Sequence, residues 1–291
     1  MTHAARRRAS PRAARASAAW LLPPLLVWAA LFAYPLGFIV REALGGADRP
    51  LSLAPVIEVL GSTMFANGLR RTITTAIGAS AGCVMLGFVL AMILTFVPFR
   101  GSRLIGRSID AFIALPTFLV VLAFTFLYGS AGLLNAGLMH VLPLASPPLD
   151  FLYSSWGVML AEITVFTPFV MRPLLASLAR IDAAQLEAAS GLGARPARIV
   201  WQIILPAALP ALLASGSLCL LLTVNEFGVV LFIGAKDVVT LPLMIHGKAL
   251  QEFDYPTACV IAVANIALSV GLFVAYRAIL GWWGSRHAAL V

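Results

Sequence analysis

The sequence contains few charged residues. Only 11% of its 291 residues are Asp, Glu, Lys or Arg, against roughly 25% in an average soluble domain, while 61% are hydrophobic. A soluble protein of this size would not have enough polar residues to cover its surface. Intrinsic disorder is also excluded, because disordered chains are poor in hydrophobic residues. A mean hydropathy of +0.96 is typical of an integral membrane protein.

Residues that form metal or catalytic sites are also scarce. Cys83, Cys219 and Cys259 are isolated in apolar runs without a CxxC pair, so we interpret them as small buried side chains. The four histidines are scattered without the spacing of metal ligands. The sequence has no Walker A pattern and no recognisable Ser/His/Asp or paired-carboxylate pattern. We therefore predict that this chain is not an enzyme and binds no metal or cofactor.

Long uncharged stretches predict an all-α membrane protein with six transmembrane helices. The fourth stretch contains one charged residue, Glu162, and the other five contain none. The third stretch is too long for one span and becomes rich in Gly, Ser, Asn and Pro from Gly129, so we expect a loop there. The predicted spans are 16–40, 72–99, 111–128, 151–171, 199–224 and 255–276.

The net charge of +8 fits a membrane protein with a positive cytoplasmic side better than a nucleic-acid-binding protein. With the N-terminus inside, the inner side holds 14 Lys and Arg residues and the outer side six. We therefore expect cytoplasmic tails at 1–15 and 281–291, around a transmembrane domain of 16–280. The basic start followed by an apolar run is too long for a signal peptide, so we expect an uncleaved first helix. Arg70 and Arg71 are predicted on the outer side, against the general enrichment of positive charge on the inner side. We expect their side chains to extend toward the outer membrane surface.

The predicted cytoplasmic loop between the fourth and fifth spans has the pattern of two short helices joined by a turn. Asp182 suits a helix N-cap, with Gln185 three residues later as in a capping box. Gly191 and Gly193 suit a helix C-terminus with positive φ, and Pro196 suits the first turn of the next helix. Capping chemistry alone is explained equally well by a simple connector and by a functional loop.

The same loop, 179–206, carries a longer motif: Glu-Ala-Ala, three residues, Gly, nine residues, Ile-x-Leu-Pro. The fixed positions are Glu187, Ala188, Ala189, Gly193, Ile203, Leu205 and Pro206. This string resembles the EAA loop of permease subunits of binding-protein-dependent ABC importers, and the resemblance extends from Asn67 to Leu280. It implies the type I ABC importer permease fold in a bacterial inner membrane. It also implies that the loop is a coupling helix that docks on a separate ATPase.

The resemblance implies several partners. They are an ABC ATPase dimer that binds the ATP, a second and different permease chain, a periplasmic substrate-binding protein and membrane lipid. The residues implied in coupling are Glu187, Ala188, Ala189, Leu192, Gly193 and Ala194. Small alanines allow a partner to approach closely, Gly193 permits a sharp turn, and Glu187 offers a charge for a basic partner residue. The flanking Arg195 and Arg198 suit lipid headgroups equally well.

Four further segments resemble permeases of 2-aminoethylphosphonate importers: 110–118, 124–135, 161–168 and 225–236. Permeases for iron(III) and polyamines share the scaffold and are the nearest alternatives. An ion-coupled secondary transporter is a more distant alternative, since it usually has an internal repeat, which we do not find. A scaffold without transport would gain little from carboxylates inside the membrane.

Two of these carboxylates, Glu162 and Glu226, are predicted at similar depth in the outer half of the membrane. Because each would cost a few kcal/mol facing lipid, both should face the protein interior or a water-filled cavity. In one role they accept hydrogen bonds from neighbours such as Thr164, Thr223 or Asn225, or pair with Arg70 or Arg71, and hold helices together. In the other role they meet the ammonium group of a zwitterionic solute while an arginine meets its anion. The candidate path residues are Glu162, Thr164, Asn225, Glu226, Arg70 and Arg71.

Overall fold

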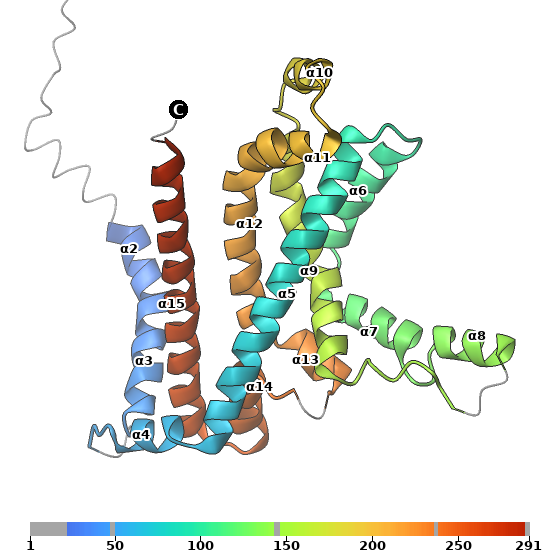
Figure 1. The fold of residues 1–291 in the computed structure, drawn as a ribbon. Coiled ribbons are helices and arrows are strands. Elements are labelled where there is room, and N and C mark those ends of the chain that lie inside the picture. Colours follow the sequence, from blue (N-terminus) through green and yellow to red (C-terminus); the bar gives the residue numbers. More distant parts are fainter. Residues whose placement is uncertain (1–21, 47–49, 143–145, 236–237, 289–291) are drawn as a thin grey trace, which may run out of the picture.

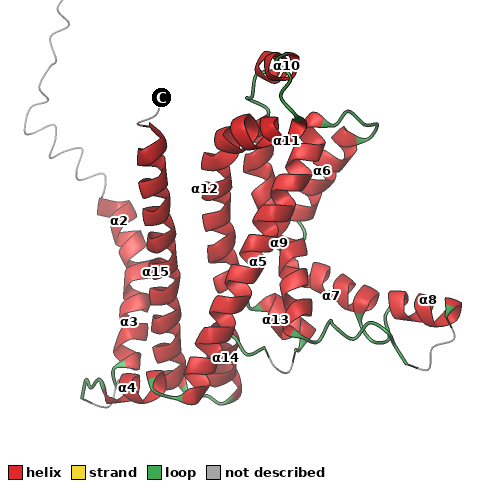
Figure 2. Cartoon of the chain, in the orientation of Figure 1, coloured by secondary structure: helices red, strands yellow, loops and turns green. Residues whose placement is uncertain are grey.

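The computed structural model describes residues 22–46, 50–142, 146–235 and 238–288 (Figure 1). These residues form helices joined by loops, with no strand among them (Figure 2), which confirms the all-α prediction. The predicted tail 1–15, the first residues of the first span and the last three residues of the chain lie outside the described ranges.

Six helical stretches have the length and hydropathy of membrane spans, which confirms the predicted number. They are Pro23–Ala43, Thr63–Phe96, Thr117–Val141, Ser155–Leu178, Pro196–Val224 and Tyr255–Ala278. The second span begins earlier than predicted because Ser62 caps it, accepting a hydrogen bond from the Phe65 N–H at 3.1 Å. The fourth runs past Arg172. Charged residues therefore lie inside these helices, whereas the prediction ended each helix at the nearest charged residue.

The described elements follow one another as short and long helices. In chain order they are α2 (Leu22–Trp28), η1 (Ala29–Ala33), α3 (Tyr34–Ala43), α4 (Ala54–Leu60), α5 (Thr63–Phe96), α6 (Ser102–Ile113), α7 (Thr117–Tyr128), α8 (Leu133–Val141), α9 (Ser155–Leu178), α10 (Ala183–Gly191), α11 (Pro196–Ile199), η2 (Val200–Ile204), α12 (Leu205–Val224), α13 (Gly228–Ile233), α14 (Leu241–His246), η3 (Gly247–Gln251) and α15 (Tyr255–Ala288). Two of the π-helical turns, η1 and η2, directly precede the segments that contain Pro35 and Pro206. A proline removes a backbone donor and crowds the preceding turn, which favours a wider turn there.

The prediction of one continuous helix at about 111–128 is wrong. The helix is interrupted at Leu115 and Pro116, because proline disfavours a helical conformation in the residue before it. The first part, α6, fills most of the segment between the predicted second and third spans and lies along α9. The second part, α7, turns to the side of the molecule, and α8 continues in the same direction within the predicted outer loop (Figure 1).

The centre of the molecule is the packing of α5, α9 and α12. Glycines on α5 allow α9 to approach closely, since an added Cβ at Gly78 would collide with Met159 and one at Gly82 with Ile163. Small residues serve this purpose in membrane helix pairs generally. Buried apolar side chains of α9 and α12 complete this core. Of the cysteines predicted to be buried, Cys83 and Cys219 are buried and Cys259 is half-buried.

Both ends of the described chain lie at the same end of the molecule as α10 (Figure 1). We call this the α10 end. The opposite end, with α4, α13 and α14, is the α4 end. The last helix, α15, continues to Ala288 through most of the predicted tail 281–291. The loop 179–206 and the two termini thus share one side, as the six-span topology requires.

Candidate functional site

The loop that carries the motif begins with a capped helix, α10. The Asp182 Oδ1 atom accepts a hydrogen bond from the Ala184 N–H at 3.0 Å, which confirms the predicted N-cap. Gln185 donates its backbone N–H to the Asp182 carbonyl at 3.1 Å, but this described loop has no hydrogen bond from the Gln185 side chain. The second half of the predicted capping box is therefore not formed. Pro196 opens α11, as predicted.

Helix α10 ends in a tight hydrogen-bonded turn. Gly193 has φ +82°, the left-handed conformation that glycine adopts most readily, whereas Gly191 is the last helical residue. The Ala194 N–H donates to the Ala189 carbonyl at 3.0 Å, and the Gly193 N–H donates to the Ser190 carbonyl at 2.9 Å. This pair of bonds is the Schellman motif, which fixes the direction in which the chain leaves the helix.

Helix α10 lies beyond the ends of the long helices (Figure 1) and presents a surface to solvent. Leu186 anchors it by packing against the core. Glu187, Ala188 and Gly193 are exposed, and Ala189 and Ala194 are half-buried. Leu192 is 89% exposed. The candidate coupling residues thus form a small, partly apolar surface with one carboxylate, held in a fixed conformation by its caps.

Glu162 lies on α9 in the core of the molecule. Its side chain is only 1% exposed, and its Oε2 atom has no hydrogen-bond partner among the described residues. The proposed donors bond elsewhere: Thr164 donates to the Leu160 carbonyl at 2.9 Å, and Thr223 contacts the Ser80 hydroxyl at 3.0 Å. Because a buried polar atom without a partner is costly, Glu162 is the carboxylate that packing explains least.

Glu226 and Asn225 lie at the break between α12 and α13. The Glu226 Oε1 atom accepts a hydrogen bond from the Val229 N–H at 2.9 Å and so caps α13. The Asn225 amide donates to Ser269 Oγ at 3.1 Å, and Asn265 donates to Asn225 Oδ1 at 3.0 Å. Glu226 therefore has a structural role as a cap, and Asn225 joins α12 to α15.

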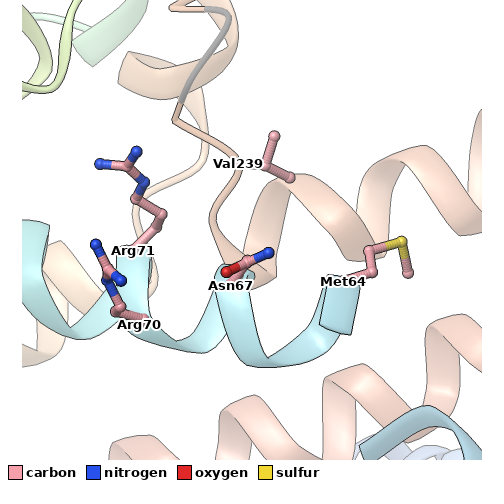
Figure 3. A pocket seen from close by; sticks show the side chains of 6 residues that line it. Met64, Asn67, Arg70, Arg71 and Val239 are labelled. Atoms are coloured by element: carbon pink, nitrogen blue, oxygen red, sulfur yellow. The ribbon is translucent and has the colours of Figure 1, made fainter. Parts of the chain in front are cut away.

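Arg70 and Arg71 line a cavity of about 390 Å³ near the start of α5. Their side chains and that of Asn67 point to the same side of the helix, toward the segment that carries Val239 (Figure 3). The Arg71 Nη1 atom donates to Ser155 Oγ on α9 at 3.2 Å. Among the described residues the ion pairs are Arg172–Asp110 and Lys248–Glu252, so neither Arg70 nor Arg71 pairs with Glu162 or Glu226.

The structure does not gather the six candidate path residues in one cavity. Arg70 and Arg71 share a cavity, whereas Thr164 faces two mostly apolar cavities beside α9. Asn67 and Ser155 are not among the candidates predicted from the sequence, because neither is charged. Helical spacing could have found Asn67, since residues three and four positions apart lie on one helix face. No local signal indicates the contact between Ser155 and Arg71, which are far apart in sequence.

Comparison with known proteins agrees with this fold. The model of the family "Binding-protein-dependent transport system inner membrane component" matches residues 83–286. The chain is 61% identical over 258 residues to the putative 2-aminoethylphosphonate transport system permease protein PhnU of Salmonella typhimurium (strain LT2), which covers 89% of this chain and 90% of that protein. It is 32% identical over 209 residues to a probable sulfate transport system permease protein, cysT, of Helicosporidium sp. subsp. Simulium jonesii, which covers 70% and 74%.

Solved structures share the fold at low sequence identity. A bacterial ABC transporter involved in the import of the acidic polysaccharide alginate matches with a TM-score of 0.77 at 15% identity, over 90% of this chain and 93% of that chain. An inward-facing MetNI methionine ABC transporter matches with a TM-score of 0.55 at 17% identity, over 77% and 96%. The chain therefore belongs to the family of inner membrane components of binding-protein-dependent transport systems, the permease subunits of ABC importers.

Proposed function

We propose that this permease imports 2-aminoethylphosphonate or a closely related phosphonate. The observation that carries the proposal is the 61% identity to permeases named for that solute, over 89% of the chain. The sulfate permeases reach only 28–32%. Such a difference favours phosphonate over the other solutes carried on this scaffold, including iron(III) and polyamines.

In this proposal α10 is the coupling helix, and the α10 end faces the cytoplasm. A separate ATPase dimer binds and hydrolyses ATP, and this chain binds no cofactor. Moving a two-state equilibrium from 1:99 to 99:1 requires about 5.5 kcal/mol, which a loose tether does not transmit. The capped helix, with exposed Leu192 and Glu187, provides a rigid surface for such a packed contact.

A periplasmic binding protein would deliver the solute to the α4 end, and a second, different permease chain would complete the path through the lipid bilayer. Within this chain we assign Glu162 to the path. A buried carboxylate without a partner suits an ammonium group, because their pairing would satisfy both charges. Glu226 and Asn225 keep their bonds within the protein and shape the break beside the path.

The test is uptake in cells that lack their own phosphonate importers. The chain is expressed with its ATPase, second permease and binding protein, and growth is measured with 2-aminoethylphosphonate as the only phosphorus source. We expect growth, which a Walker A substitution in the ATPase should abolish. Radiolabelled sulfate, iron(III) and spermidine serve as competing solutes. Uptake of one of these without uptake of 2-aminoethylphosphonate would overturn the assignment.

A further inference from the structure

We propose that Arg70, Arg71 and Asn67 form an oxyanion-binding subsite at the α4 end of the permease. Its ligand is a tetrahedral phosphonate or phosphate group. The identification of that group as one end of the transported solute rests on the function proposed above. The geometry of the subsite does not.

Helix α5 brings the three side chains together. Asn67 stands three and four residues before Arg70 and Arg71, so all three project from neighbouring positions on the helix surface. Figure 3 shows their polar ends on the same side of α5, facing the segment that carries Val239. The cavity between them, of about 390 Å³, has room for a tetrahedral oxyanion and further solute atoms.

One arginine is held in place by the protein. The Arg71 guanidinium donates to Ser155 Oγ at 3.2 Å, and this contact joins α5 to the first residue of α9. A guanidinium has five donors in a planar fork, so one bond to Ser155 leaves others for a ligand. Arg70 is exposed beside it, and Asn67 adds an uncharged amide donor. The group therefore offers several donors to one acceptor-rich ligand.

The positive charges of Arg70 and Arg71 favour binding of an anion. Two arginines line one cavity, and among the described residues no carboxylate lies within 4.0 Å of either. A doubly charged phosphonate would compensate both charges and accept bidentate hydrogen bonds. The same cavity adjoins a second one of about 370 Å³, because Met64 and Val239 line both. A solute larger than its oxyanion therefore has adjacent space.

The oxyanion has two possible sources, a soluble phosphonate and the phosphate of a lipid headgroup. A cysteine reporter in the cavity distinguishes them. Met64, which is 43% exposed, is changed by Met64→Cys in the complete importer, reconstituted in phosphatidylcholine nanodiscs. The rate of labelling by a membrane-impermeant maleimide is then measured. The importer without Met64→Cys gives the background from all other cysteines, of which Cys259 is the one in this chain that is not buried.

We expect 2-aminoethylphosphonate and ethylphosphonate to slow labelling, and ethanolamine, which lacks the phosphonate, to have no effect. Arg71→Gln should raise the concentration of ethylphosphonate for half-protection at least about tenfold, and Arg71→Lys by less, because it keeps the charge and loses the fork. Arg41→Gln removes an exposed charge from the last turn of α3, which also lies at the α4 end of the molecule. This variant is the matched control. Copurification of the ATPase verifies assembly of each variant.

Several results would overturn the subsite. One is equal protection by ethylphosphonate in Arg71→Gln and in the protein without it. Another is protection by ethanolamine but not by ethylphosphonate. The third is slowed labelling only when phosphatidylglycerol is added to the nanodiscs, which would assign the arginines to lipid. Protection by ethylphosphonate without 2-aminoethylphosphonate uptake would overturn the proposed solute and support the subsite. Normal 2-aminoethylphosphonate uptake without any protection from labelling would support the proposed solute and overturn the subsite.

Discussion

The turn after α10 allows the coupling role to be tested at a single backbone position. Gly193 has φ +82°, and a Cβ added there would meet no atom of the chain within 4 Å. The cost of Gly193→Ala is therefore the left-handed backbone alone, about 1–2 kcal/mol. The free loop can relieve this strain by opening its Schellman turn, but a docked loop cannot. We expect ATPase binding to weaken roughly 5- to 30-fold.

Three further substitutions separate the causes. Gly193→Asn should weaken binding less than Gly193→Ala, because Asn tolerates the left-handed region better. Gly193→Asp adds a charge at the contact and should lower ATPase association and uptake while the protein stays in the membrane. Gly191→Ala is the matched control, since that glycine is helical with open space around it, and Ala favours a helix by up to about 1 kcal/mol.

The measurement is the amount of ATPase that copurifies with the permease from nanodiscs, together with solute uptake by the same preparations. Membrane content of each variant is measured by immunoblot. If Gly193→Ala and Gly193→Asp bind the ATPase and import solute as well as Gly191→Ala, the coupling role is refuted. If Gly193→Asn weakens ATPase binding more than Gly193→Ala does, contact with the partner rather than backbone strain determines the order of the variants.

Three other predictions address the remaining sites. Removing the charge with Glu162→Gln should lower uptake at least about tenfold with assembly intact, whereas Glu226→Gln, which keeps an acceptor for the α13 cap, should change uptake little. Reporter fusions after Arg286 and near Ser146 should report cytoplasm and periplasm respectively, because the positive charges gather on the inner side. Leu192→Ala should weaken ATPase association about tenfold, because it removes the large apolar side chain exposed directly after α10; copurification measures it.

Each of these has a contradicting result. Normal uptake by Glu162→Gln would remove that carboxylate from the path, and failed assembly would give it a structural role only. The opposite fusion pattern would invert the topology. Unchanged ATPase copurification with Leu192→Ala would mean that α10 contacts its partner through other residues.

The features that sequence predicted well are set by short-range chemistry. Asp182 caps α10 and Pro196 opens α11 because each acts on backbone groups within a few residues. The number of spans follows from hydropathy, which does not depend on tertiary contacts. The break at Pro116 was missed because an uncharged run on both sides of it hid the local effect of the proline. Local stereochemistry should have outweighed hydropathy at that position.

The candidate site was harder to predict because partners come from distant helices. Equal roles were expected for Glu162 and Glu226, yet only the latter lies at a helix start where backbone N–H groups are available. Asn225 finds its partners on α15, and Arg71 finds Ser155 on α9. Such pairings depend on how helices pack, which hydropathy and spacing along one helix do not specify.

Helix α9 has a mechanical consequence. It spans 24 residues, about 36 Å at 1.5 Å per residue, and the short segment 179–182 connects it to α10. Pro168 and Pro173 remove backbone hydrogen bonds in the half nearest α10, so bending concentrates there, and the other half is a stiff arm clamped to α5 at Gly82. A tilt of about 5° of this arm about Pro168 would move Ser155, which lies about 20 Å away along the helix, by about 2 Å. Ser155 accepts a hydrogen bond from Arg71. A movement of α10 caused by the ATPase would therefore displace the Arg71 guanidinium through α9.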